Sequence, residues 1–250
     1  MNKILMLAVM LLCIAADAVG QDTYRPMLTE GKSWVVVTTT DFKDMYPFLE
    51  DYEIVKTVSR DTVIDGHSCK IIENVRKDTG GRYSSVLLEE DRVIYWYDQS
   101  KKEFVRWMDF NLHLGDDLYK GWGVGYEDWD YVLSEGTVEV NGIGYRRMGI
   151  GFMGYKPSRY WVEGIGASRW GVDSSPFIST MGIYTYMKAC YENDECIFTK
   201  DDFYKEAAGG VAIPSDAGVE DGAVYDLQGR RLRHTVPGIN IVNGKKILTR

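Results

Sequence analysis

The chain has 250 residues, a formal net charge of −8 and three histidines. Residues 224–250 hold six Lys or Arg and one Asp, so the rest of the chain carries a net charge of −13. A body this acidic argues against nucleic acid as a partner, and the basic tail is too short to reverse that.

The first twenty residues predict a signal peptide, residues 1–20. Lys3 gives a short positive start, and residues 4–16 form an apolar run that is too short to span a bilayer. Ala18 and Gly20 are small residues that suit the cleavage site. We therefore expect export through the periplasm to the outer cell surface or the medium, with no transmembrane segment in the mature chain.

Residues 21–206 read as one antiparallel β domain. Asp65-Gly66 and Asn141-Gly142 separate apolar runs and predict tight hairpin turns. The fold class we expect is all-β: an antiparallel meander that is curled into a barrel or folded into a sandwich, plus a small C-terminal β-hairpin appendage. The strand-like stretches are 33–39, 52–59, 62–72, 82–88, 92–97, 103–110, 137–140, 143–150, 159–166, 183–191 and 195–200. An acidic turn over residues 89–91 is expected between the stretches 82–88 and 92–97.

The cysteines of the body fit an exported chain. Cys190 and Cys196 flank a polar segment between two strand-like runs, and cross-strand cysteines beside a tight turn can reach disulfide geometry. A disulfide between them is our prediction. Two free thiols are the alternative, and a metal site would need further ligands. Cys69 is expected to be a small buried hydrophobe.

Catalytic motifs are absent from the sequence, which predicts no catalytic residues, no cofactor and no metal site. One aromatic segment favours ligand binding, because rings beside carboxylates suit the faces and hydroxyls of sugars. The alternative is that these rings are buried in a β core. The candidate ligand-binding residues are Trp122, Tyr126, Glu127, Asp128, Trp129, Asp130 and Tyr131.

A linker and a tail follow the body. Residues 207–222 contain eight Ala or Gly among sixteen residues, which predicts a flexible linker. Residues 223–250 form a separate basic segment, in which Asn243-Gly244 predicts a closing hairpin with a two-residue turn. A hairpin is marginally stable alone, so we expect it to pair with a strand over 224–228.

Through Tyr225-Asp226-Leu227, Gly229-Arg230 and Gly244-Lys245, this tail resembles the C-terminal sorting domain of proteins that the type IX secretion system of Bacteroidota exports. The resemblance implies that the outer-membrane secretion machinery reads the tail. The body resembles a group of uncharacterised secreted proteins of the same bacteria through 62–72, 160–168 and 190–203, and that group implies no activity. The matching tail residues include Tyr225, Asp226, Leu227, Gly229, Arg230, Gly238, Gly244 and Lys245.

Together these features favour an exported, non-enzymatic β protein of the cell surface or medium, delivered through its C-terminal tail. A carbohydrate-binding or adhesive module is the alternative, and glycans would then be its partners. A glycan hydrolase ranks third, because a glycosidase needs two carboxylates at a defined separation across a cleft. An acidic β protein offers such pairs by chance.

Overall fold

The computed structural model describes residues 24–40, 50–118, 130–169, 172, 183–212, 224–225, 231–232, 238–242 and 245–249. Over these ranges the regular structure is strand, apart from the short 3₁₀ helix η2 (Lys200–Tyr204). The predicted all-β class is therefore confirmed. None of the described residues lies in a helix long and apolar enough to cross a bilayer.

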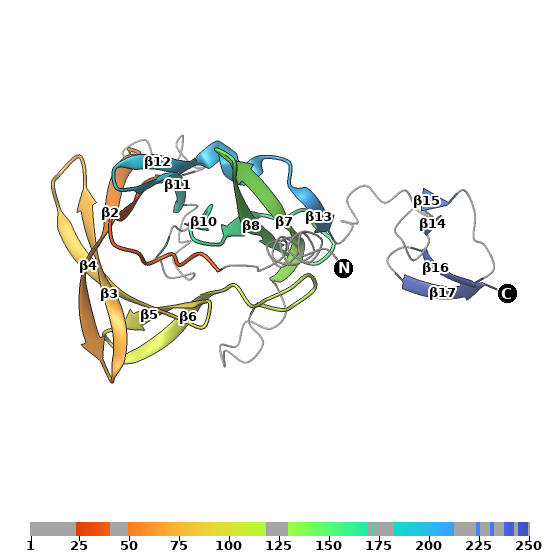
Figure 1. Cartoon of the computed structure of the whole chain (residues 1–250), viewed down its shortest axis with the longest axis horizontal. Coiled ribbons are helices and arrows are strands. Elements are labelled where there is room, and N and C mark those ends of the chain that lie inside the picture. The colour runs from red at the N-terminus through yellow and green to blue at the C-terminus, as the bar shows by residue number, and fades with distance from the viewer. Residues whose placement is uncertain are drawn as a thin grey trace, which may run out of the picture.

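The larger sheet is an antiparallel meander that two strands from late in the chain extend at one edge. Among the described residues it holds eight strands in the order β12-β11-β1-β2-β3-β4-β5-β6 (Figure 1). The late strands β11 and β12 pair beside β1, so the two ends of the body meet in one sheet. The strand bounds are β1 (Lys32–Thr40), β2 (Tyr52–Ile64), β3 (His67–Arg76), β4 (Arg82–Glu90), β5 (Val93–Asp98), β6 (Glu103–Asp109), β11 (Ile183–Glu192) and β12 (Glu195–Thr199).

A second antiparallel sheet packs against the first. Its described strands lie in the order β10-β9-β8-β7-β13, and the two sheets do not close into a barrel. One hydrophobic core joins them, with Trp34 and Ile94 from the larger sheet and Met148 and Trp161 from the smaller. The bounds are β7 (Tyr131–Val140), β8 (Ile143–Gly151), β9 (Arg159–Val162), β10 (Gly166–Ala167) and β13 (Ala208–Ala212).

The hairpin turns follow the predicted chemistry. Asp65-Gly66 and Asn141-Gly142 have positive φ at both residues, as a two-residue type I′ turn requires. The turn between β4 and β5 also has two positive φ values, 49° at Asp91 and 66° at Arg92. The sequence placed an acidic turn over residues 89–91, whereas β4 continues through Glu90.

Two predicted boundaries are corrected. The expected flexible linker begins at residue 207, but Ala208–Ala212 form β13 and pair with β7 at the edge of the smaller sheet. Small residues permit this close pairing, because a Cβ on Gly136 of β7 would lie 2.8 Å from the Cα of Gly210. The expected strand 159–166 is interrupted after Val162, and β10 then returns antiparallel to β9.

Residues 24–28, which we call the N-terminal strap, precede β1 and lie against the larger sheet. The Glu89 carboxylate accepts hydrogen bonds from the Tyr24 hydroxyl at 2.5 Å and from the backbone N–H groups of Met27 at 2.8 Å and Leu28 at 2.7 Å. Met27 is fully buried in the common core. Burial and the neighbouring Glu89 charge raise the pKa of Tyr24, which keeps its hydroxyl a donor.

The tail forms a third small sheet, which Figure 1 draws apart from the other two. Its described strands lie in the order β15-β14-β16-β17. Val224 pairs with Val242 of β16, so the predicted pairing of the hairpin with the 224–228 region is confirmed. The bounds are β14 (Val224–Tyr225), β15 (Arg231–Leu232), β16 (Gly238–Val242) and β17 (Lys245–Thr249).

Candidate functional site

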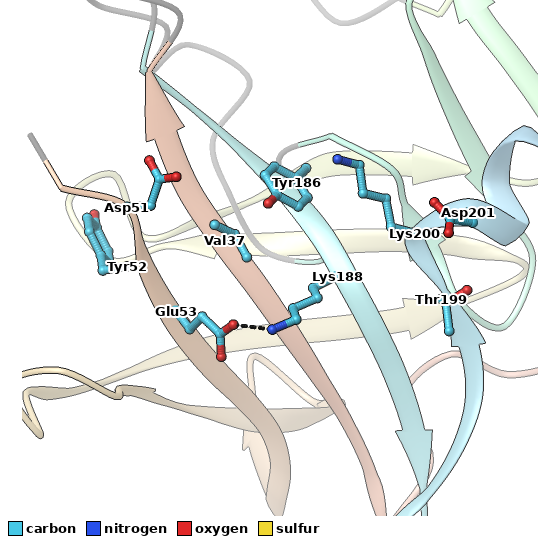
Figure 2. A pocket seen from close by; sticks show the side chains of 9 residues that line it. All are labelled: Val37, Asp51, Tyr52, Glu53, Tyr186, Lys188, Thr199, Lys200 and Asp201. Atoms are coloured by element: carbon cyan, nitrogen blue, oxygen red, sulfur yellow. Dashed lines mark hydrogen bonds and ion pairs between the residues drawn. The ribbon is translucent and has the colours of Figure 1, made fainter. Parts of the chain in front are cut away.

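A pocket of about 550 Å³ opens on the larger sheet, where β11, β1 and β2 lie side by side (Figure 2). This volume lies within the range of small-molecule sites, about 300–1,000 Å³. We call it the tyrosine pocket, after the two tyrosines in its wall. It is lined by Val37, Asp51, Tyr52, Glu53, Tyr186, Lys188, Thr199, Lys200 and Asp201.

Strand register explains why Val37, Glu53 and Tyr186 share one face of the sheet. Val37 stands opposite Glu53 on β2 and opposite Tyr186 on β11, and directly opposed residues in a sheet point to the same side. Trp34 and Val36 alternate to the other side and are fully buried in the core. Val37 is therefore the apolar floor of the tyrosine pocket, with polar residues around it.

A β-bulge adds Lys188 to the pocket. Val35 pairs with Ala189 and Val36 pairs with Met187, so the register between β1 and β11 skips Lys188. An extra residue of this kind bends the strand and redirects side chains. Figure 2 shows the Lys188 side chain extending to the Glu53 carboxylate on β2.

Glu53 is shared by two lysines. Its Oε1 atom pairs with the Lys188 ammonium and its Oε2 atom lies 2.6 Å from the Lys77 ammonium. Hydrogen bonds from Lys188 and then Lys77 lower the pKa of Glu53, and the bond to Glu53 raises the pKa of Lys188. Glu53 is thus held as a carboxylate, with one positive charge in excess beside it.

A cationic side chain lies over the ring of each tyrosine in the pocket. The Arg76 guanidinium lies 3.7 Å from the centroid of the Tyr52 ring, and the Lys200 ammonium lies 4.1 Å from the centroid of the Tyr186 ring. Such contacts orient both the ring and the cation. Both rings remain partly exposed, so each keeps aromatic surface that a ligand can contact.

The start of η2 fixes the third side of the pocket. The Asp202 carboxylate accepts hydrogen bonds from the backbone N–H and the hydroxyl of Thr199, both at 2.7 Å. This is a capping box, which satisfies the first free N–H groups of the helix. Because Asp202 and Phe203 are buried, Lys200 and Asp201 are held on the outer side.

The predicted ligand-binding segment is only partly described. Trp122, Tyr126, Glu127, Asp128 and Trp129 lie outside the described residues, so their role stays a prediction. Asp130 is 7 % exposed, and its Oδ2 atom lies 2.6 Å from Nη2 of Arg159, itself buried. Tyr131 is half-buried and begins β7. Asp130 thus points into the body, whereas the sequence analysis expected its carboxylate to be available to a ligand.

The predicted Cys190–Cys196 disulfide is wrong, since Cys69, Cys190 and Cys196 are free thiols in the structure. The register explains the difference. Cys190 stands opposite Phe198 and Cys196 opposite Tyr191, with a shift between residues 190 and 191. Cys190 is fully buried and its burial raises the pKa of its thiol to about 12. Cys69 is buried, as predicted.

Of the tail residues that were predicted to act in sorting, the structure describes three. Tyr225 pairs with Arg231 and Ile241, Gly238 pairs with Thr249, and Lys245 pairs with Val242. The last pairing is the register expected of a hairpin closed by residues 243 and 244. Asp226, Leu227, Gly229, Arg230, Asn243 and Gly244 lie outside the described residues.

The tyrosine pocket was missed by sequence analysis. Glu53 and Tyr186 are far apart in the chain and share one face only because β2 and β11 both pair with β1. Over the described residues no group of three or more His, Cys, Asp or Glu is arranged to hold a metal ion. No protein-family model, curated protein or solved structure was found to match the chain.

Proposed function

We propose that the protein is an exported, non-enzymatic β protein that binds a carbohydrate in the tyrosine pocket. The observation that carries this proposal is the partly exposed ring of Tyr186 beside the apolar floor at Val37, with Tyr52 in the wall of the same pocket. Aromatic surface contacts the C–H face of a sugar ring, while Asp51 and Lys188 supply acceptors and donors for its hydroxyls.

Binding fits this pocket better than hydrolysis. A glycosidase needs a carboxylic acid with a raised pKa as its proton donor, together with a second carboxylate. The two lysines on Glu53 lower its pKa instead, so this residue cannot serve as that acid near neutral pH. Thr39 donates a hydrogen bond to Asp51 at 2.6 Å, which orients that carboxylate as an acceptor.

Tyr186→Ala should weaken sugar binding by about tenfold, equivalent to about 1.4 kcal/mol. The reason is the loss of the aromatic surface beside Val37. A glycan array would first identify the ligand of the mature chain, and titration calorimetry would then compare variants whose fold is verified by circular dichroism. Tyr155→Ala is the matched control, because Tyr155 is 66 % exposed and lies outside the pocket.

The same titrations test the aromatic segment predicted from sequence. If Trp129→Ala abolishes binding while Tyr186→Ala leaves it unchanged, the sugar binds at residues 122–131 and the pocket assignment is wrong. If no glycan binds the folded chain at all, the carbohydrate-binding proposal itself fails.

For delivery we propose that the C-terminal sheet is read by outer-membrane secretion machinery. Support comes from the resemblance of the tail to sorting domains and from the pairing of β14 with β16, which joins the hairpin to the strand before it. A two-stranded hairpin is marginal in water, whereas more strands allow independent stability. The tail is also positively charged, in contrast to the body.

Residues 207–250, fused to an unrelated reporter that bears a signal peptide, should carry the reporter to the medium or surface of a type IX-competent host. Fractionation and immunoblotting measure the result. The matched control is the same fusion cut at residue 237, which removes β16 and β17 and should leave the reporter in the periplasm. Equal export of both fusions would show that β16 and β17 are not needed for secretion. Export of neither fusion, while a full-length family tail is exported, would show that this short tail is not a sufficient secretion signal.

A further inference from the structure

The charges of the tyrosine pocket are distributed unevenly around its floor. Lys188 and Lys77 share the single carboxylate of Glu53, which leaves one positive charge in excess on that side. Lys200 adds a second: in the described part of the chain no carboxylate pairs with it, and its ammonium contacts the ring of Tyr186. Lys188 on β11 and Lys200 at the start of η2 are the positive groups of the pocket lining, whereas Lys77 follows β3.

The Lys200 ammonium lies over the Tyr186 ring, and Lys200 as a whole is exposed. Figure 2 shows its side chain running from the end of β12 towards Tyr186, while the Asp201 carboxylate lies near the start of η2. The ring contact and the capped start of η2 restrict where this charge can go. A preorganised cation loses less conformational entropy when it pairs with a ligand charge.

The opposite rim is acidic. Asp51 is exposed beside the start of β2, and Thr39 orients its carboxylate through a hydrogen bond at 2.6 Å. An acceptor in this position suits neutral hydroxyl groups of a ligand. A ligand that matches the whole pocket thus carries an anionic group towards Lys200 and hydroxyl donors towards Asp51, with an apolar ring face between them.

We propose that the ligand is an oligosaccharide containing a hexuronic acid, whose carboxylate pairs with Lys200. This inference rests on the proposed carbohydrate-binding function and names its ligand class. A hexuronic acid carries its carboxylate at the edge of the ring, so one sugar unit offers a C–H face to the exposed part of the Tyr186 ring and a charge to the ammonium that lies over that ring. Its hydroxyls then donate to Asp51.

The test compares three probes of equal length with the mature chain: an oligogalacturonate, its methyl ester and a neutral galacto-oligosaccharide. The oligogalacturonate should bind at least about fivefold tighter than either uncharged probe, which is the factor for an ion pair of about 1 kcal/mol. This advantage should shrink as salt is raised, because exposed charges are screened.

Lys200→Gln should remove the advantage of the charged probe and leave the affinity for the neutral probe nearly unchanged, and Lys200→Arg should restore most of it. Lys101→Gln is the control for net charge, since Lys101 lies on the turn between β5 and β6, outside the pocket. Equal binding of all three probes would overturn the uronate assignment but keep the proposed function. Binding of none would overturn both.

Discussion

Glu89→Ala should lower the free energy of unfolding by about 3 kcal/mol, because one carboxylate fastens the N-terminal strap. The change removes the acceptor of three hydrogen bonds, from the Tyr24 hydroxyl and from the backbone of Met27 and Leu28. Hydrogen bonds to a charged group contribute about 1.5–3 kcal/mol each, and a donor left buried adds its desolvation cost. The estimate is kept low because Glu89 is only partly buried.

The strap matters beyond these bonds because it also reaches the smaller sheet. The Glu163 carboxylate, between β9 and β10, accepts the backbone N–H of Arg25 and an N–H of Arg92, each at 3.0 Å. Arg92 stands on the turn that follows Glu89. Loosening residues 24–28 therefore weakens a link between the two sheets and opens the core around Met27.

Guanidinium unfolding of residues 21–250 measures this effect. Glu90→Ala is the matched control, because Glu90 is exposed on the same strand and should change stability only slightly. Tyr24→Phe removes the hydroxyl alone and should cost about 1 kcal/mol. If Glu89→Ala behaves like Glu90→Ala, the strap does not contribute to folding stability.

The strap and the pocket could not be predicted from the sequence, whereas the hairpins could. Asp65-Gly66 and Asn141-Gly142 are local signals, since both residues of the turn determine its backbone. Glu89 instead acts on residues more than sixty positions earlier. Its acidic neighbours made it look like part of a turn, and only the three-dimensional fold shows that its side chain has partners.

Strand register explains two further features that the sequence analysis missed. The disulfide was inferred from cysteine spacing, but the two-residue turn between β11 and β12 places Tyr191 opposite Cys196, and the shift after Cys190 places Phe198 opposite Cys190. The shift between β1 and β11 leaves Lys188, which lines the pocket, outside the strand pairing. A bulge changes which residues oppose each other, and neither bulge had a signal in composition or alternation.

The second large effect is expected at the buried ion pair between β9 and the start of β7. Arg159→Met should lower the free energy of unfolding by about 3–5 kcal/mol, because it leaves the Asp130 carboxylate buried without the cation that now lies 2.6 Å away. Both residues are buried, so water cannot easily replace the lost partner. Arg60→Met, on an exposed stretch of β2, is the control for loss of an arginine.

A double substitution separates a structural role of Asp130 from the ligand-binding role that its sequence position favoured. Replacing a buried pair by apolar residues is often neutral or stabilising, so Arg159→Met combined with Asp130→Val should recover most of the loss. Denaturation curves of the two single variants and the double variant give the coupling energy between the residues. Additive losses would show that the two charges do not depend on each other. Recovery of stability together with unchanged sugar binding would establish that Asp130 holds the edge of the smaller sheet and contacts no ligand.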